Sequence, residues 1–378
     1  RNMDLAIISL CARPLVASAA RAGLSPLSLD LFANLDTCAK AARCVRVHRA
    51  NGHAFDGDDL IAALTGLAPA GLPVVLGSGL EDDPALMERI AARNPILGNT
   101  ADTVRVLKDP LALAALCGAL SIPFPAVTIE APDSGFAAGP VLEKKIGGAG
   151  GGHIRRRDFG DLTPPAPGHF LQREVAGETY SIQLLANGTE ALFVGACRQW
   201  HYPDDVHPFR YGGMVGPVAL PTAHAGRMIA AALTVARACG LVGLVSIDVV
   251  VGREGWWLVE VTPRLSAMLD ILDTDPLPPL MGLHLAACGG KLPSSLAVPA
   301  EHRASALLYA EEDVLIPDSD WPAAAVDRPA PGTAVRAGAH ICAVRAGGPT
   351  AEAAERVLED RVHEVREWLG LERIALAV

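Results

Sequence analysis

The sequence lacks the cysteine patterns that mark zinc sites and disulfide frameworks. Its eight cysteines are scattered along 378 residues, with no Cys-x-x-Cys pair and no nearby group of cysteines and histidines. In a chain of this length, such spacing favours reduced thiols inside packed cores. We therefore expect a cytoplasmic protein without a disulfide framework or a zinc site.

Long apolar runs are also missing, since no stretch reaches the roughly 18 uninterrupted residues that a membrane span requires. The segment LAIISLCARPLVASAA could pass for the apolar core of a signal peptide, but Arg13 and Pro14 interrupt it and Asp4 precedes it. It predicts a buried strand that runs into a helix. We expect no association with membranes.

Basic side chains are in deficit, with 32 lysines and arginines against 42 aspartates and glutamates, which gives a net charge of -10. Because affinity for phosphate backbones comes from clustered lysine and arginine, this balance argues against a general nucleic-acid partner. Half of the residues are hydrophobic and a fifth are charged, which suffices for large packed cores. The length predicts two or three structural units.

Strands and helices alternate in the first hundred residues. Apolar runs at 5–10, 26–30 and 74–80 predict strands, and a helical stretch of small apolar residues follows the first run. This alternation predicts a βαβ domain with a parallel sheet that ends near Gly98.

The rest of the chain predicts helices and hairpins. Residues 102–125 predict one helix, stopped by glycine and proline, and then an extended segment. Asn187-Gly188 between two apolar runs predicts a hairpin. From about residue 293, short strands precede a final helix whose apolar residues recur at helical spacing. The fold class expected is therefore α/β, of the α+β kind.

The segment KKIGGAGGGHIRRRD, residues 144–158, holds five glycines between positions 147 and 152. His153 follows the last of them, which excludes a Walker A loop, and the last glycine of a dinucleotide fingerprint is missing. Two interpretations stay open. The segment is either a flexible linker or surface loop, or a mobile lid whose backbone N–H groups cover a polyphosphate while lysines neutralise it.

Two carboxylates lie in VSIDVVVGREGWWLVEVT. Strand alternation places three residues on one face of each strand: Ser246, Asp248 and Val250 on the first, and Trp256, Leu258 and Glu260 on the second. If the turn centres on Glu254, then Asp248 and Glu260 are direct cross-strand partners.

Facing carboxylates need a positive group between them, and hard oxygen ligands suit Mg²⁺ or Mn²⁺. Two alternatives remain: another register with one carboxylate in solvent, and a metal-free acid–base pair. Arg264, which follows Glu260 closely, favours an anion site.

Taken together, four motifs resemble the ATP-grasp superfamily. They are Lys108, a strand ending in Lys144 before the glycine run, LQREVAGETYS, and the pair IDVVV and LVEVTPR, and they occur in the superfamily's order. The resemblance spans nearly the whole chain. It implies a pre-ATP-grasp βαβ domain at 1–98, a small lobe with the glycine-rich lid at 99–170, a large lobe with the metal site at 171–292, and a C-terminal β-rich subdomain with a helix at 293–378.

The resemblance also implies a nucleotide site. Lys108 and Lys144 match the lysines that contact ATP phosphates, and Lys144 and Arg264 are implied in catalysis. The phosphate-covering loop corresponds to Gly147, Gly148, Gly150, Gly151 and Gly152. The segment that receives adenine, followed by the acid that holds the ribose, corresponds to Gln172, Arg173, Glu174, Val175 and Glu178. The magnesium ligands correspond to Asp248, Glu260 and Thr262.

Two positions depart from the superfamily's pattern. Lys145 stands where a proline usually follows the second lysine, and it adds a cation at the edge of the loop. Thr262 stands where the third metal ligand is usually the asparagine of Glu-x-Asn-Pro-Arg. Because the threonine side chain is shorter, one metal ion is expected to be held more weakly or through water.

The implied activity is the ATP-dependent joining of a small carboxylate and an amine into an amide, through an acyl phosphate, with release of ADP and phosphate. A narrower similarity, to predicted carboligases distantly similar to biotin carboxylase and to tyramine-glutamate ligase, suggests an amino-acid ligase of one-carbon cofactor biosynthesis, of the methanofuran or tetrahydromethanopterin type. A carboxylase, a phosphotransferase and a non-catalytic nucleotide sensor remain alternatives. Related enzymes are often dimers, which allows a homodimer.

A polar, proline-broken segment, RQWHYPDDVHPFRYGG, holds further candidates for substrate contacts. Ordinary surface positions are the favoured explanation of these residues. They are Arg198, His201, His207 and Arg210, with Ser266 as a candidate from another segment.

Overall fold

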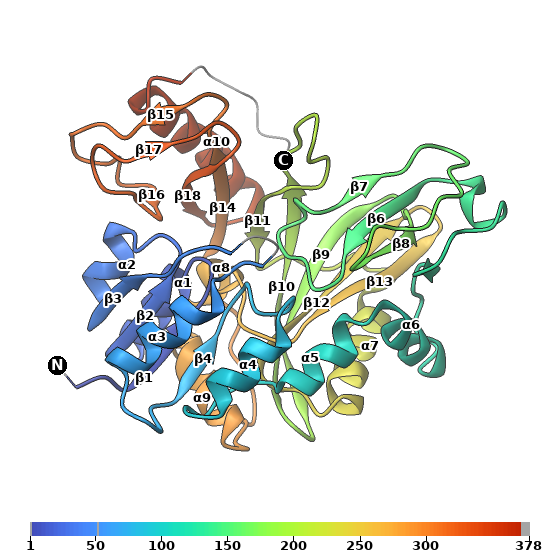
Figure 1. Ribbon diagram of the computed structural model, residues 1–378, viewed down its shortest axis with the longest axis horizontal. Helices are drawn as coiled ribbons and strands as arrows, with labels where there is room; N and C mark the ends of the chain where they lie inside the picture. Colours follow the sequence, from blue (N-terminus) through green and yellow to red (C-terminus); the bar gives the residue numbers. More distant parts are fainter. Residues whose placement is uncertain (1, 51–52, 372–378) are drawn as a thin grey trace.

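The computed structural model describes residues 2–50 and 53–371. Three sheets organise the chain: an N-terminal sheet of four strands, a small sheet of four strands and a large sheet of eight strands. Figure 1 shows the N-terminal sheet in blue beside the C-terminal part in red, and the small sheet in green on the other side of the molecule. In the described part of the chain, no helix has both the length and the apolar character needed to cross a membrane.

The N-terminal sheet is parallel, in the order β3-β2-β1-β4, which confirms the βαβ prediction. Its strands β1 and β2 are buried along their whole length, as expected where helices cover both faces. The strands are β1 (Leu5–Ile8), β2 (Pro26–Asp30), β3 (Arg43–Arg46) and β4 (Val74–Leu76). The helices are α1 (Arg13–Arg21), α2 (Leu35–Lys40), α3 (Gly57–Leu67) and α4 (Pro84–Ala91).

The prediction of one helix after residue 102 is wrong, because two helices occupy this segment. They are α5 (Ala101–Lys108) and α6 (Pro110–Ala119). Pro110 has no N–H to continue α5, and the Asp109 carboxylate caps α6 by accepting from the backbone N–H of Leu111 at 2.9 Å. The break leaves Lys108 at the very end of α5, where its side chain is directed to the large sheet.

The small sheet has the order β5-β8-β6-β7, with antiparallel pairing throughout. The glycine run joins β6 to β7, and β6 also pairs with β8, so the run lies between two antiparallel strands. The elements are β5 (Val127–Thr128), the 3-10 helix η1 (Phe136–Ala138), β6 (Val141–Lys145), β7 (Arg155–Arg156) and β8 (His169–Arg173).

The large sheet has the order β13-β12-β9-β10-β11-β14-β18-β16. Both predicted hairpins form, one at Asn187-Gly188 and one between β12 and β13. The strands are β9 (Glu178–Asn187), β10 (Ala191–His201), β11 (Tyr211–Gly216), β12 (Val242–Gly252), β13 (Gly255–Thr262), β14 (His302–Tyr309), β16 (Ala325–Val326) and β18 (His340–Gly348). Two short strands form a separate pair, β15 (Val314–Leu315) with β17 (Ala334–Val335).

Helices cover both faces of the large sheet. Helix α7 (Ala225–Ala238) packs against β9 and β10 on one face, while α8 (Leu269–Leu272) and α9 (Leu280–Cys288) pack on the other. Helix α10 (Ala351–Trp368) covers β18 and β14, so the last strands continue the same sheet and have their own helical cover.

The expectation that all cysteines are reduced is wrong for one pair. Cys38 and Cys44 form a disulfide, with their Cα atoms 5.0 Å apart. The short helix α2 turns directly into β3 and brings these two residues within the usual bridging distance, which their spacing in the sequence did not reveal. The other six cysteines are free thiols in the described structure.

Candidate active site

The hairpin of β12 and β13 pairs Asp248 directly with Glu260, as predicted. The pairing shifts on the way: Val249 lies opposite Leu258, so Val259 is an extra residue in β13, a β-bulge.

The bulge reverses the faces of β13. Trp256 and Leu258 lie in the hydrophobic core with Val249, and so does Val261 beyond the bulge. Glu260 therefore points to the opposite face, beside Asp248. The prediction that Glu260 shares a face with Trp256 and Leu258 is wrong, because simple alternation does not count the extra residue.

Asp248 is held by neutral donors from the neighbouring strands. Its Oδ1 accepts hydrogen bonds from the hydroxyl of Ser181 and, at 3.3 Å, from the amide of Gln199. Burial and the negative charge of Glu260 raise the pKa of Asp248 to about 6. A cation bound beside Asp248 would stabilise its ionised form.

Glu260 faces the two lysines. The Lys108 ammonium donates to Glu260 Oε1 at 2.7 Å, and Lys144 from β6 adds a second positive charge nearby. Partial burial acts to raise the pKa of Glu260, but the two lysines outweigh it and hold the pKa at about 2. Burial lowers the pKa of Lys144, and the charge of Glu260 opposes this change. Helix α5, the small sheet and the large sheet therefore meet at a compact set of opposite charges.

The glycine run of residues 147–152, called the lid from here on, contacts the rest of the protein on two sides. On one side, Tyr211 donates its backbone N–H to the Gly150 carbonyl at 2.8 Å. Gly151 has a φ of 70°, and a Cβ there would stand 1.9 Å from the Phe209 carbonyl oxygen. Only glycine fits such a close backbone contact.

On the other side, the lid touches the N-terminal domain. A Cβ on Gly147 would stand 2.5 Å from the Glu81 carbonyl oxygen, and the Lys145 ammonium contacts Asp82 Oδ2 at 2.7 Å. The cation that replaces the usual proline thus ties the entrance of the lid to the first domain.

Arg264 also bridges to the first domain. Its guanidinium pairs with Glu81, whose other oxygen accepts from the backbone N–H of Gly79 at 3.0 Å. Burial would raise the pKa of Glu81, but the charges of Arg264 and Lys108 lower it. Glu81 therefore stays ionised and fixes the orientation of Arg264 next to the lysines.

An open pocket of ≈ 610 Å³ lies at the tip of the β12–β13 hairpin. Its size is ordinary for a small-molecule site. It brings together Glu174, Val175 and Glu178, which the sequence predicts to surround adenosine, and adds the indole of Trp257. Gln172 and Arg173 serve neighbouring contacts: Gln172 accepts from Lys144 at 3.0 Å, and Arg173 donates to the Phe136 carbonyl at 2.6 Å.

Thr262 pairs with Ser246. This pair lies two residues along each strand from Asp248 and Glu260, and Thr262 is 7% exposed. Within residues 2–50 and 53–371, no group of three or more His, Cys, Asp or Glu side chains could hold a metal ion. Any metal at the Asp248–Glu260 pair therefore needs neutral oxygens or phosphate as its remaining ligands.

The residues between 198 and 210 that were predicted as candidates for substrate binding make contacts within the protein. Arg198 pairs with Glu355 of α10, and His207 with Asp204 at 2.9 Å. The guanidinium of Arg210 lies 3.9 Å from the centroid of the Tyr309 ring. His201 stacks edge-on against Phe209, the residue whose carbonyl contacts the lid. Ser266 accepts from the Met268 backbone N–H at 3.4 Å.

Sequence reasoning missed several residues of this site. Ser181 and Gln199 reach Asp248 from two strands whose pairing partners no local pattern reveals. Glu81 and Asp82 come from a different domain. The one signal available was strand alternation, which can indicate the face on which Ser181 lies but not its partner.

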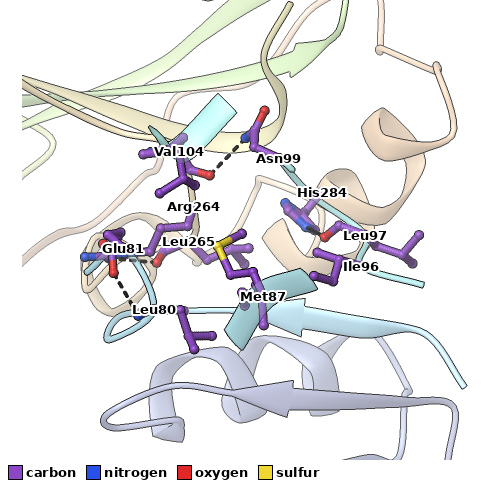
Figure 2. Close-up of a pocket in the computed structure, with 14 residues that line it drawn as sticks. Leu80, Glu81, Met87, Ile96, Leu97, Asn99, Val104, Arg264, Leu265 and His284 are labelled. Carbon is purple, nitrogen blue, oxygen red and sulfur yellow. Dashed lines mark hydrogen bonds and ion pairs between the residues drawn. The ribbon is translucent and has the colours of Figure 1, made fainter. Parts of the chain in front are cut away.

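A small pocket lies where the N-terminal domain meets the large sheet (Figure 2). The Glu81–Arg264 pair lies toward one end of it, and Asn99 and His284 lie toward the other. The Asn99 side chain donates to the carbonyls of Val242 and Pro263 at 3.0 and 2.9 Å, which fixes the segment that carries Arg264.

His284 predicts a pH dependence of stability. Its Nδ1 accepts from the Leu244 N–H at 2.9 Å and its Nε2 lies 2.9 Å from the Leu97 carbonyl, so the neutral ring fits both contacts. Burial lowers its pKa to about 4. Because the folded pKa lies below the unfolded value of about 6.5, its contribution is complete above pH 6.5. As the pH falls toward 4, we expect a loss of about 3 kcal/mol in the free energy of unfolding.

Urea unfolding at pH 7 and pH 4.5 measures this effect. A His284→Gln variant should be less stable at pH 7 but should lose less on acidification than the unsubstituted protein. Equal losses in both proteins would contradict the assignment.

Comparison with known proteins supports the resemblance. Residues 111–268 match the family model described as ATP-grasp domain. None of the curated proteins matches the sequence.

Solved structures share the fold over nearly the full length. The biotin carboxylase domain of Hydrogenobacter thermophilus 2-oxoglutarate carboxylase, in complex with MgADP, ADP and bicarbonate, is 12% identical, with 97% of this chain and 90% of that chain covered and a TM-score of 0.72. Biotin carboxylase of Campylobacter jejuni is 16% identical, with 95% and 91% covered and a TM-score of 0.72. N5-carboxyaminoimidazole ribonucleotide synthetase of Thermus thermophilus is 17% identical, with 98% and 99% covered and a TM-score of 0.66.

These findings confirm the predicted resemblance to the ATP-grasp superfamily and the mixed α/β class. The protein shares the fold of these biotin carboxylases and of the ribonucleotide synthetase, and residues 111–268 match the ATP-grasp domain model.

Proposed function

We propose that the protein is an ATP-dependent carboxylate–amine ligase that forms an amide through an acyl phosphate and releases ADP and phosphate. The observation that carries the proposal is the meeting of Asp248 and Glu260 with Lys108 and Lys144, the second of which lies just before the glycine lid. Such an arrangement serves to hold a metal-bound polyphosphate and to neutralise charge during phosphoryl transfer.

The proposal assigns the two ends of ATP to two parts of the site. The pocket at Glu174, Glu178 and Trp257 is the proposed adenosine end, and the lysines under the lid are the proposed phosphate end. Trp257 offers an aromatic face for the base, and the Glu178 carboxylate offers an acceptor for ribose hydroxyls. The Arg156–Glu174 pair at 2.7 Å closes the pocket from the side of the small lobe.

The donor set suits Mg²⁺ or Mn²⁺. Asp248 and Glu260 would hold the ion, with Thr262 as a further oxygen ligand, directly or through water. Bound there, the ion would offset the charge of the transferring phosphoryl group.

The protein's own residues would perform the remaining work. Lys108 and Lys144 neutralise the phosphates, and Arg264, oriented by Glu81, stabilises charge on the phosphoryl oxygens. A substrate carboxylate oxygen attacks the terminal phosphorus as the bond to ADP breaks. An amine then attacks the acyl carbon, loses a proton, and phosphate leaves. The closed lid excludes water, which would otherwise hydrolyse the acyl phosphate.

The narrower role remains part of the proposal. The motif similarity favours an amino-acid ligase of one-carbon cofactor biosynthesis, acting in the cytoplasm as a homodimer. A second candidate, ATP-dependent carboxylation, is favoured by the bicarbonate complex of the similar Hydrogenobacter thermophilus domain. The substrate that replaces a carboxylate in that reaction would be bicarbonate.

Release of ADP tests the proposal. The protein is incubated with ATP, Mg²⁺ and a panel of amino acids, aromatic amines and bicarbonate, and the products are analysed by mass. We expect ADP together with a new amide. ADP that appears only with bicarbonate would replace the ligase by a carboxylase, and ATP binding without ADP in any mixture would favour a nucleotide sensor.

A further inference from the structure

His153 is the first residue after the glycines of the lid, which joins β6 to β7 (Figure 1). Its Nδ1 lies 3.1 Å from the backbone nitrogen of Lys145, whose N–H donates to it. An imidazole that accepts at Nδ1 carries its proton on Nε2 when neutral. The ring therefore keeps one N–H donor that this contact does not use.

Gly148 leaves the space that the imidazole fills. A Cβ at this position would stand 2.5 Å from His153 Cδ2 and 2.6 Å from Nε2. The backbone of Gly148 is not in the left-handed region, so a side chain would be excluded by the ring alone. The lid is thus folded around His153.

The ring lies close enough to the charged set to interact with Lys108, Lys144 and Glu260. Burial is the largest influence on its pKa and, together with the two lysines, lowers it to about 4 against the opposing charge of Glu260. A neutral imidazole donates a hydrogen bond without adding a third cation. His153 does not line the pocket at Glu174 and Trp257 that we propose for adenosine.

We propose that the Nε2–H of His153 donates a hydrogen bond to the terminal phosphate of ATP when the lid is closed. This inference rests on the proposed function, since it takes the lysine end of the site as the phosphate end. This hydrogen bond distinguishes ATP from ADP, because ADP lacks the terminal phosphate that accepts from the Nε2–H.

Calorimetric titration with two nucleotides tests the inference. The probes are Mg²⁺ with the β,γ-imido analogue of ATP, and Mg²⁺ with ADP. His153→Ala should bind the analogue about tenfold to a hundredfold more weakly, since a hydrogen bond to a charged group is lost, and should bind ADP within about twofold of the unsubstituted protein.

Two further variants separate the donor from the fold of the lid. His153→Gln retains an N–H donor and should recover part of the affinity for the analogue. Gly148→Ala keeps the imidazole but displaces it, and should show the same selective loss as His153→Ala. His169→Ala, on the strand paired with β6, is the matched control and should bind both nucleotides normally.

Equal losses for both nucleotides would show that His153 only supports the fold of the lid, and unchanged affinities would show that it has no contact with phosphate. Either result overturns the inference while ATP binding by the unsubstituted protein stands. If the unsubstituted protein binds neither nucleotide, the proposed function itself fails.

Discussion

Replacement of Asp248 by Asn, or of Glu260 by Gln, is expected to lower kcat for ADP release by about a thousandfold or more while the fold is retained. Each substitution removes one carboxylate of the directly paired set and keeps its shape. Glu260→Gln also leaves the Lys108 ammonium without its ionised partner at 2.7 Å. The measurement is ADP release under saturating substrates, with circular dichroism as the check on folding.

Asp102→Asn provides the control. Asp102 lies on α5, the helix that carries Lys108, but its side chain is 89% exposed and pairs with Arg105 on the same helix. The Asp102→Asn variant should release ADP at the same rate as the unsubstituted protein. Full activity in the Asp248 or Glu260 variant would remove the metal site, and the lysines alone would then have to hold the nucleotide.

Arg13→Ala is expected to lower the free energy of unfolding by about 3–5 kcal/mol, the range for breaking a buried ion pair on one side. Arg13 is 4% exposed and donates to Asp270 Oδ1 at 2.6 Å and to Asp327 Oδ1 at 2.5 Å. These three residues come from the N-terminal domain, from α8 and from the segment after β16. The substitution leaves Asp327 without its cation and leaves Asp270 with Arg345 alone, at 3.3 Å.

The loss in the free energy of unfolding caused by Arg13→Ala should depend on pH. Burial acts to raise the pKa of Asp327, but Arg13 lowers it below its ordinary value in the intact cluster. That stabilisation is present above the unfolded pKa of about 3.9 and is lost as the pH falls through the lower folded value. Without Arg13, burial dominates and the carboxylates take up protons at a higher pH. The difference from the unsubstituted protein should therefore be larger at pH 7 than at pH 4.

Urea unfolding at both pH values measures these differences. Arg303→Ala, which removes an exposed pair with Glu301 at 3.0 Å, is the control and should cost less than about 1 kcal/mol. A loss below about 1 kcal/mol for Arg13→Ala would show that the cluster does not hold the three parts of the chain together.

Local pattern was sufficient for much of the fold. The apolar runs of β1, β2 and β4 and the turn at Asn187-Gly188 predicted their elements correctly, because strand burial and turn chemistry are encoded within a few residues. The same reasoning failed at Pro110. This residue begins a second helix where the pattern predicted one continuous helix.

The candidate site also has one feature that was predicted and one that was not. Asp248 and Glu260 pair as predicted, but the turn alone does not set this pairing. The hairpin closes with Gly252 opposite Gly255, and without a bulge that register would place Asp248 opposite Val259. The bulge at Val259 was not predicted, because an extra residue leaves no mark in the alternation until the partner strand is known. The face of Glu260 is therefore a property of the paired strands.

By itself, the sequence determined the resemblance to the ATP-grasp superfamily, the strand-and-helix order of the first domain and the residues that carry charge. Only the tertiary structure decided which charges meet. Glu81 reaches Arg264, Asp82 reaches Lys145 and Arg13 reaches Asp327 across long separations in the chain. Such contacts depend on how the sheets and helices pack, and packing is set by the whole fold rather than by any local pattern.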